Sequence, residues 1–305
     1  LTKVTLNEVA HSIFYAPQYV AIEEGYFAEK GLDLTLVTGF GADKTMTAVI
    51  SGEADIGFMG AEASVYAYQE GATDPVVNFA QLTQRAGNFL VAREEMPDFK
   101  WEDLKGEKVL GGRKGGMPEM VFEYILKKNG IDPQKDLTID QSIDFGSTAA
   151  AFTSDDSAAY TVEFEPSATI LEKEGAGYVV ASLGEASGYV PYTSYSTKAS
   201  YMKENPEIIQ KFTDALQKGM DYVQNHTPEE IAEVIAPQFK ETDLETITAI
   251  VKRYYDQDTW KENLIFEKDS FELLQDILED AGELTDRTAY ENLVQTEYAQ
   301  KACKN

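Results

Sequence analysis

The order of strand-like and helix-like segments constrains the fold of this chain more than any other feature. From residue 4 to residue 182, short apolar stretches alternate with segments that carry apolar residues at helical spacing. This alternation is typical of α/β domains, in which helices cover a largely parallel sheet. The expected strands are 4–6, 32–37, 54–58, 76–82, 89–91, 109–110, 137–143, 158–162 and 178–182, and the expected helices are 17–27, 43–51, 62–70, 118–128, 147–153 and 166–174.

Two interruptions divide the chain into domains. Residues 94–105 contain Met96-Pro97-Asp98, which breaks regular structure, so we place a domain crossing there. Residues 189–195 alternate again and return the chain to the first domain. We therefore expect domain I to comprise 1–93 and 195–305, and domain II to comprise 94–194.

Beyond Asn205 the chain is nearly all helical. Thr227 and Thr242 are expected to cap helix N-termini, and Gly282 is expected to cap a C-terminus. This tail therefore informs the architecture rather than the chemistry. The expected helices are 206–224, 228–239, 244–255 and 270–281.

A glycine-rich turn from Gly111 to Gly116 joins the strand at 109–110 to the helix that starts near Pro118. Glycine lets backbone N–H groups approach a bound group, and a helix N-terminus favours anionic or electron-rich atoms. The turn is therefore a candidate ligand contact. A tight strand-to-helix turn without a ligand explains the glycines equally well.

The charge balance narrows the class of partner. The 305 residues include 53 acidic and 26 basic residues, and the net charge is -27. Phosphate binding needs a concentrated basic face, so we expect neither nucleic acid nor an anionic membrane surface as a partner. No apolar run approaches the ~18 residues of a membrane span, and we expect a soluble mature chain of two domains.

Cysteine and histidine are too sparse for a metal cluster. Cys303 is the single cysteine, which excludes an intrachain disulfide. His11 and His226 lie far apart, so a histidine-rich site is not expected. The chain shows neither an initiator methionine nor a signal peptide, so we expect processed or trimmed material. We expect no metal and no cofactor.

Several motifs resemble one family of bacterial proteins. The stretch from Ala16 to Leu32 contains Glu24-Gly25-Tyr26-Phe27 and Glu29-Lys30-Gly31-Leu32. It is similar to a helix, a turn and a strand entry in the substrate-binding proteins of bacterial ABC importers. The similarity is to the branch that includes the sulfonate/nitrate/taurine binders and the thiamine-pyrimidine-precursor binders. Further matches, at Ser51–Phe58, Trp101–Gly106 and Glu165-Pro166, extend the resemblance over the first two thirds of the chain.

The resemblance implies a two-domain periplasmic-binding-protein fold of type II, with two interdomain crossings and a helical C-terminal tail. It also implies an extracytoplasmic receptor, free in the periplasm or lipid-anchored at the outer face of the cell membrane. Such a receptor delivers a small molecule to the membrane permease of an ABC importer and acts by domain closure. We expect a monomer.

Loops at the carboxyl ends of strands are the expected ligand contacts, because open α/β sheets place their sites there. Ligand pockets are mostly apolar with a few placed polar groups, and these loops have that composition. The candidate ligand contacts are His11, Phe14, Tyr15, Met59, Gly60, Glu62, Arg85, Arg113, Gly115, Gly116, Met117, Glu163, Phe164, Glu165 and Tyr192.

The charged candidates leave two ligand classes open. Arg85 and Arg113 can each bind two oxygens of a carboxylate or sulfonate through a planar guanidinium, although for Arg85 pairing with an acidic neighbour near the hinge is favoured. Unpaired Glu62, Glu163 or Glu165 would instead favour a cation or a neutral ligand with amino donors. The acid content favours a pyrimidine-like heteroaromatic ligand. An alkanesulfonate-, taurine- or nitrate-type anion is the alternative.

Two other functional classes fit the sequence less well. Glu163 and Glu165 could support acid–base catalysis by an enzyme of pyrimidine metabolism, but the chain has no nucleophile elbow, metal-spaced set or Walker-type loop. Eukaryotic thiamine-precursor relatives carry a cysteine cluster, whereas this chain has only Cys303. A ligand-sensing regulator would need a helix-turn-helix or a basic segment near Leu1, and the sequence shows neither there. We therefore expect a binding protein and not an enzyme.

Overall fold

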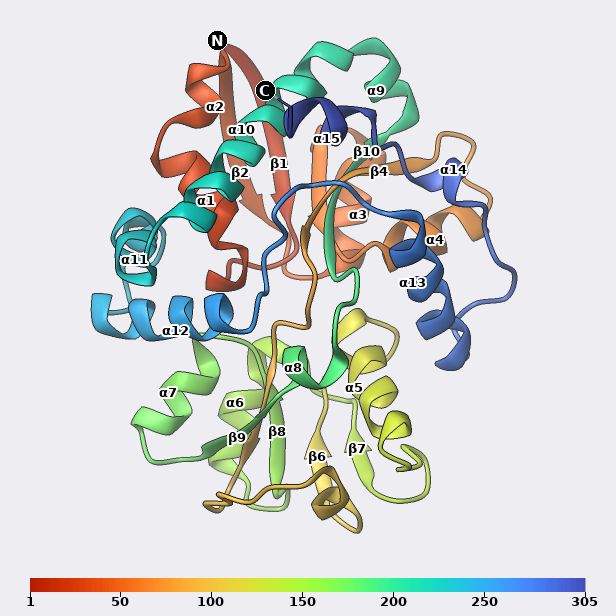
Figure 1. The fold of residues 1–305 in the computed structure, drawn as a ribbon. Coiled ribbons are helices and arrows are strands. Elements are labelled where there is room, and N and C mark those ends of the chain that lie inside the picture. Colours follow the sequence, from red (N-terminus) through yellow and green to blue (C-terminus); the bar gives the residue numbers. More distant parts are fainter. Residues whose placement is uncertain (305) are drawn as a thin grey trace. The chain divides into compact units, whose positions relative to one another are not determined.

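The computed structural model describes residues 1–304, which form two compact units, each built on its own five-stranded sheet (Figure 1). Unit 1 comprises residues 1–84, 191–275 and the segment from Thr285 onward, and unit 2 comprises residues 85–190 and 276–284. Both sheets combine parallel and antiparallel strand pairs and are flanked by helices. The α/β class predicted from the alternation is confirmed.

The sheet of unit 1 has the strand order β2-β1-β3-β10-β4. β1 pairs in parallel with β2 and β3, whereas β10 runs antiparallel to both β3 and β4. The carboxyl ends of the first four strands in sequence therefore meet the amino end of β10 at one edge. The strands are β1 (Thr2–Glu8), β2 (Leu32–Thr38), β3 (Ile56–Met59), β4 (Val76–Thr83) and β10 (Thr193–Lys198).

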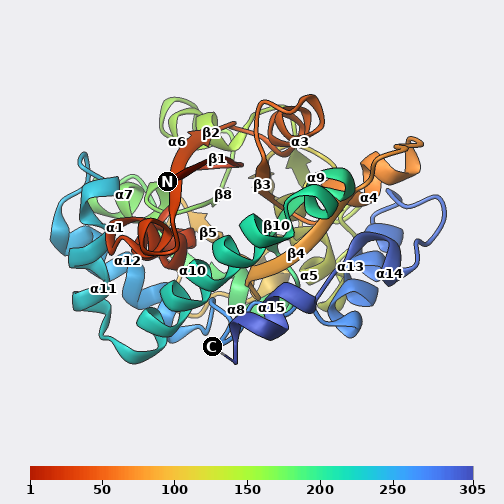
Figure 2. The same cartoon turned by 90° about the horizontal axis from the view of Figure 1, so that it is seen from above.

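Both faces of this sheet are buried. Phe58 stacks on Tyr195 with ring centroids 4.1 Å apart, and Phe212 of α10 (Pro206–Asn225) packs edge-on against Tyr195. Met59 belongs to a separate apolar cluster with α3 (Ala42–Ser51) and α4 (Glu62–Gln69), because successive residues of a strand face opposite sides. In Figure 2, α10 crosses one face of the sheet and α3 lies on the other.

The remaining helices of unit 1 follow the sequence pattern with local corrections. The predicted helix 17–27 is two helices, because Gly25 adopts a φ of 76° that ends the first one. Thr227 caps its helix as predicted, but Asp243 rather than Thr242 caps the next helix. These helices are η1 (Ile13–Tyr15), α1 (Ala16–Glu23), α2 (Tyr26–Glu29), α9 (Ala199–Glu204), α11 (Pro228–Ile235), η3 (Ala236–Gln238), α12 (Leu244–Asp256), α14 (Tyr290–Leu293) and α15 (Glu297–Ala302).

The sheet of unit 2 has the order β7-β6-β8-β5-β9. Phe89 of β5 lies opposite both Glu163 of β8 and Ser182 of β9, so these residues mark one edge of the sheet. The strands are β5 (Phe89–Ala92), β6 (Lys108–Leu110), β7 (Thr138–Asp140), β8 (Tyr160–Glu163) and β9 (Tyr178–Ser182). The helices are η2 (Trp101–Leu104), α5 (Met117–Lys128), α6 (Phe145–Ser154), α7 (Ser167–Lys173) and α8 (Leu183–Ser187), while α13 (Lys268–Asp280) has residues in both units.

The pairing of β5 differs from the domain limits expected from the sequence. The sequence analysis assigns residues 85–93 to domain I, whereas β5 pairs with β8 and β9 in the sheet of unit 2. Residues 276–284 also belong to unit 2, although the helical tail was expected to lie wholly in domain I. Strand pairing is a long-range contact, and the break at Met96-Pro97 marked the loop after β5 rather than the crossing before it.

Gly219 of α10 tests the helix packing in unit 1. A Cβ at Gly219 would lie 2.4 Å from the backbone oxygen of Pro17, so we expect Gly219→Ala to lower the free energy of unfolding by about 1–3 kcal/mol through overpacking. The matched variant Gly146→Ala in α6, where a Cβ meets nothing within 4 Å, should instead be neutral or stabilising. Urea unfolding of both variants measures the difference, and equal effects would contradict this account of the α1–α10 contact.

Candidate functional site

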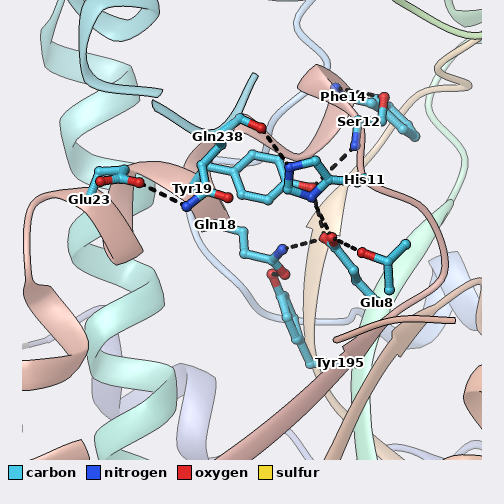
Figure 3. Close-up of polar contacts among 10 residues, drawn as sticks. Glu8, His11, Ser12, Phe14, Gln18, Tyr19, Glu23, Tyr195 and Gln238 are labelled. Atoms are coloured by element: carbon cyan, nitrogen blue, oxygen red, sulfur yellow. Dashed lines mark hydrogen bonds and ion pairs between the residues drawn. The ribbon is translucent and has the colours of Figure 1, made fainter. Parts of the chain in front are cut away.

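A buried carboxylate, Glu8, organises the carboxyl edge of the unit 1 sheet (Figure 3). Its Oε1 accepts hydrogen bonds from His11 Nδ1 at 2.6 Å and Thr38 Oγ1 at 2.9 Å. Its Oε2 accepts from Gln18 Nε2 at 2.9 Å and the Tyr19 hydroxyl at 2.7 Å. Four donors satisfy the carboxylate, so a fully buried negative charge is tolerated here.

His11 uses both ring nitrogens within this network. Nδ1 donates to Glu8, and Nε2 donates to the carbonyl oxygen of Gln238 at 2.9 Å. With an ionised Glu8 neither acceptor carries a proton, so the two bonds then form together with the doubly protonated imidazolium. Burial opposes this charge, but the hydrogen bond and the negative charge of Glu8 raise the pKa of His11 above 6.5. His11 therefore joins β1 to η3 and has no spare donor for a ligand, unlike the sequence expectation.

The stability of the protein should depend on the protonation of His11. Because the folded-state pKa of His11 lies above its unfolded value, the stabilisation is present below pH 6.5 and is lost as the pH rises through the folded pKa. We expect His11→Gln to lower the free energy of unfolding by roughly 1–3 kcal/mol at low pH and to flatten this pH dependence. Denaturant unfolding from pH 6 to pH 9 measures both effects.

His226→Gln is the control for this prediction, because His226 stacks on Tyr222 and, within residues 1–304, its side chain hydrogen-bonds only the Tyr222 backbone carbonyl of α10. This variant should keep the wild-type pH dependence. An unchanged pH dependence in His11→Gln would show that the imidazolium does not link β1 to η3.

Aromatic rings surround the next part of the same edge. Tyr15 packs edge-on against Phe58 at 4.5 Å, and Phe14 contacts both Tyr15 and Tyr192 at 5.1 and 5.5 Å between centroids. Phe14, Tyr15 and Tyr192 are at most 4% exposed. The structure thus brings three of the predicted aromatic candidates together, while Phe58, stacked on Tyr195, is a core residue.

Polar groups lie within this aromatic cluster. The Tyr15 hydroxyl hydrogen-bonds Thr193, and burial raises the pKa of Tyr15 well above its usual value. Within residues 1–304 the hydroxyl of Tyr192 has no hydrogen-bond partner, although it is buried. Burial and then the neighbouring Tyr15 and Glu62 raise the pKa of Tyr192. A buried hydroxyl without a partner is costly, so this position is suited to a polar ligand atom.

Glu62 opens α4 and lies beside these tyrosines. It is 3% exposed, and its carboxylate folds back so closely that a Cβ on Gly60 would lie 2.0 Å from its Oε2. Gly60 therefore makes room for the carboxylate, and Met59 packs beneath it in the α3–α4 cluster. Gly60 and Glu62 follow β3 as predicted, whereas Met59 is the last residue of the strand rather than part of the loop. Glu62 adds a second buried carboxyl group, besides Glu8, to this edge.

The glycines in the glycine-rich turn of unit 2 differ in how closely other atoms pack against them. Gly112 has a φ of 76°, and a Cβ there would lie 2.3 Å from the ring of Phe145, so this glycine is required by packing. Gly115 and Gly116 have no such contact closer than 3.5 Å. Arg113 projects outward with a 63% exposed side chain, 3.5 Å from Asp144, and does not form a buried anion clamp. Met117 is buried at the start of α5.

Glu119, one member of a carboxyl pair on α5, holds this turn, and the sequence analysis did not identify the pair. Glu119 accepts hydrogen bonds from the Gly115 backbone N–H at 3.2 Å and from Gln141 Nε2 at 2.8 Å. Burial and then the charge of Glu123, one helical turn later, raise the pKa of Glu119 to about 7. Two glutamates spaced i,i+4 among apolar helix residues were the available signal for this pair.

The acidic segment after β8 also carries a protonatable group. Glu163 is 1% exposed and accepts a hydrogen bond from Thr161 at 2.9 Å; burial raises its pKa to about 7 against the lowering effect of Thr148 and Thr161. Glu165 instead accepts from the backbone and hydroxyl of Thr169 at the start of α7. Phe164 lies between them, half-buried, with its ring against Phe145.

Glu163 should make the protein less stable as the pH rises. Its folded pKa lies near 7 and its ordinary pKa near 4.5, so the folded protein binds more protons in this window. The free energy of unfolding should fall between these pH values by an amount on the order of 3 kcal/mol from this group. Glu163→Gln should remove that part of the slope, whereas exposed Glu174→Gln should not. A slope unchanged by Glu163→Gln would show that the carboxyl titrates normally.

The segment before β5 contains two further polar residues. Arg85 is half-buried, donates from Nη1 to the Gly184 carbonyl oxygen at 2.9 Å and lies over the Tyr189 ring at 4.3 Å. Asn88 is fully buried, and within residues 1–304 neither its amide nitrogen nor its amide oxygen has a partner. The sequence analysis did not identify Asn88 as a candidate, since nothing local reveals its burial.

No group of three or more metal-ligating His, Cys, Asp or Glu side chains occurs in the described residues. Among the helices of residues 1–304, none has the length and apolar character needed to cross a membrane. Two surface hollows, of about 150 and 440 Å³, lie away from all the predicted ligand contacts. The smaller lies along α6 and α7, and the larger lies against the end of α4 and the segment 285–292.

Comparison with known proteins identifies the family. The model of the NMT1/THI5-like family matches residues 13–231. The chain belongs to this family. It is 48% identical to YtlA of Bacillus subtilis (strain 168) over 301 residues, which cover 99% of this chain and 90% of YtlA. It is also 25% identical to the riboflavin-binding protein RibY of Chloroflexus aurantiacus, over 68% of this chain and 58% of RibY.

Solved structures show the fold of this family member. The ligand-binding component of an ABC-type import system from Staphylococcus aureus matches with a TM-score of 0.80 at 13% identity, over all of both chains. The alkanesulfonate-binding protein SsuA from Xanthomonas axonopodis pv. citri, bound to MOPS, matches with a TM-score of 0.77 at 15% identity, over 97% of this chain and 99% of SsuA. The predicted periplasmic-binding-protein fold is confirmed.

Proposed function

We propose that this protein is the extracytoplasmic solute-binding receptor of an ABC importer and captures a small heteroaromatic ligand for a membrane permease. Its membership of the NMT1/THI5-like family and its near full-length similarity to YtlA support a role shared with that protein. The fold that it shares with a ligand-binding component of an import system supports the same role. The proposed mechanism is ligand-favoured domain closure, in which the permease recognises the closed form.

One observation supports a ring-shaped ligand over a simple anion: buried aromatic rings and buried carboxyl groups occupy the carboxyl edge of the sheets. In unit 1, Tyr15 and Tyr192 lie beside Glu62. In unit 2, Glu163 has a pKa of about 7 and can either donate or accept a hydrogen bond near neutral pH. A heteroaromatic ligand with ring N–H or amino groups matches this set, because it stacks on the rings and donates to the carboxyl groups. RibY, by its name, binds a heteroaromatic compound.

An alkanesulfonate-, taurine- or nitrate-type anion is the second candidate ligand. The Nε of Arg85 is buried without a hydrogen-bond partner in the described part of the chain, and a guanidinium can bind an oxyanion. The similarity in fold to SsuA is consistent with this class. Against it, Arg113 is exposed beside Asp144, and Glu62 and Glu163 would repel an anion when ionised.

An enzyme on the same fold is the alternative from another functional class. The paired carboxyls Glu119 and Glu123 could exchange protons, but Glu119 accepts hydrogen bonds from the Gly115 backbone and the Gln141 side chain, and Glu123 is hydrogen-bonded to Glu119. Glu165 is likewise engaged with Thr169. These acidic residues therefore stabilise the local fold through hydrogen bonds, and we propose binding without catalysis.

A thermal-shift screen tests the proposal. The probes are riboflavin, 4-amino-5-hydroxymethyl-2-methylpyrimidine, MOPS, taurine and nitrate, each added to the purified protein. A ligand that binds the folded state raises the melting temperature by mass action, so we expect a rise with at least one heteroaromatic probe. A rise with MOPS, taurine or nitrate alone would replace the proposed ligand by an anion. No rise with any probe would contradict both ligand classes.

Glu62→Gln then tests the proposed contact. Loss of a charge-assisted hydrogen bond should weaken binding of the heteroaromatic probe about tenfold or more in calorimetric titration. The control variant Glu53→Gln changes an exposed carboxylate at the surface and should bind as the wild type does. Equal affinity of the two variants would remove Glu62 from the ligand contacts.

A further inference from the structure

The amide of Asn88 is a buried polar group that the fold leaves unused. Asn88 immediately precedes β5, at the edge of the unit 2 sheet where Phe89 lies opposite Glu163 and Ser182. Its side chain is 0% exposed, and across residues 1–304 neither Nδ2 nor Oδ1 finds a hydrogen-bond partner. Only its backbone is engaged, through its carbonyl oxygen, which accepts from the Leu183 N–H at 3.1 Å.

A second buried asparagine shows what a structural amide looks like in this protein. Asn78 of β4 is 1% exposed. Its Nδ2 donates to Ser64 Oγ at 2.9 Å and to the Leu293 carbonyl oxygen at 3.0 Å, and its Oδ1 accepts from Ser194 Oγ at 2.7 Å. Asn78 therefore links four segments of unit 1. Asn88 has the same chemistry and burial but makes none of these side-chain bonds.

Buried polar groups in folded proteins almost always have a partner, because an unpaired one loses its hydration without compensation. An apolar residue of similar size would fill the position of Asn88 without that cost. A partner absent from the protein itself accounts for the amide. The Nε of Arg85, three residues earlier, is buried and unpaired in the same segment, so the segment offers two donors and one acceptor.

We infer that the Asn88 amide binds the hydrogen-bonding edge of the transported ring, on which an N–H donor stands beside a carbonyl oxygen or ring-nitrogen acceptor. This inference rests on the proposed receptor function and names the ligand class more closely. The planar amide can donate from Nδ2 and accept at Oδ1 at the same time, which matches a lactam, imide or aminopyrimidine edge. A sulfonate or nitrate has acceptors only and would leave Oδ1 unpaired.

The position of Asn88 in the sheet of unit 2 also supports its role as a ligand contact. The Asn88 backbone is adjacent to the end of β8, where the Glu163 carboxyl lies, because β5 pairs with β8 from Phe89 onward. The Arg85 side chain is fixed by the Gly184 carbonyl and the Tyr189 ring, which holds the segment against α8 and the chain that follows. The polar groups that meet the ring edge are therefore carried by a braced segment.

The test compares Asn88→Leu with the matched variant Asn78→Leu. Calorimetric titration with riboflavin and with 4-amino-5-hydroxymethyl-2-methylpyrimidine should show affinity about tenfold weaker or worse for Asn88→Leu, because the bidentate contact is lost. The melting temperature of ligand-free Asn88→Leu should equal or exceed that of the wild type. Asn78→Leu should melt well below the wild type, because it removes three structural hydrogen bonds.

Three results would overturn the inference. Affinity of Asn88→Leu within twofold of the wild type for a heteroaromatic probe would refute the contact while leaving the receptor function intact. A melting temperature of Asn88→Leu lowered as far as that of Asn78→Leu would show that the amide is structural. Wild-type binding of MOPS alone would refute the ring edge as the ligand class, whereas wild-type binding of none of the probes would refute the proposed function itself.

Discussion

The buried carboxylate of Glu8 is the interaction on which the organisation of unit 1 depends. A negative charge without water is tolerated only with full hydrogen bonding, so its four donors must stay in place. Those donors come from β2, α1 and the loop that carries His11. Through Gln18 and His11 the network reaches Tyr195 of β10 and Gln238 of η3, segments far apart in the sequence. The loop after β1 is thereby fixed, and with it the rings of Phe14 and Tyr15.

Both units bury acidic groups near the ends of their strands, but they stabilise them differently. Glu8 is held by donors and by an imidazolium, whereas Glu163 and Glu119 have a pKa of about 7 because burial outweighs their hydrogen bonds. The two kinds of site respond alike to pH: each binds protons more tightly in the folded protein, so folding is favoured on the acid side of neutrality. Of these carboxyls, Glu163 is the one proposed to meet the ligand, whereas Glu119 holds Gly115 and Gln141.

Some buried polar side chains of this protein have hydrogen-bond partners within the fold, and others have none among residues 1–304. Asn78 bonds Ser64, Ser194 and the Leu293 carbonyl, whereas the Asn88 amide and the Tyr192 hydroxyl find no partner among residues 1–304. The glycines of the glycine-rich turn also differ from one another. A Cβ at Gly112 would collide with Phe145, whereas a Cβ at Gly115 would meet open space. Binding proteins accept such local costs where a ligand supplies the missing contacts.

The sequence by itself determined the α/β class, most strands, the longer helices and the loops that follow the strands, because periodicity, glycines and caps are local signals. The short helices α8, α9, α14 and α15 were not predicted. It also indicated the acidic, aromatic character of the candidate contacts, including Tyr15, Glu62 and Glu163. Only the tertiary structure decided that β5 joins the second sheet, that His11 is used internally by Glu8 and Gln238, and that Arg113 faces solvent. It alone distinguished Asn88 from Asn78. Strand pairing, burial and hydrogen-bond satisfaction depend on residues distant in sequence, and no local pattern encodes them.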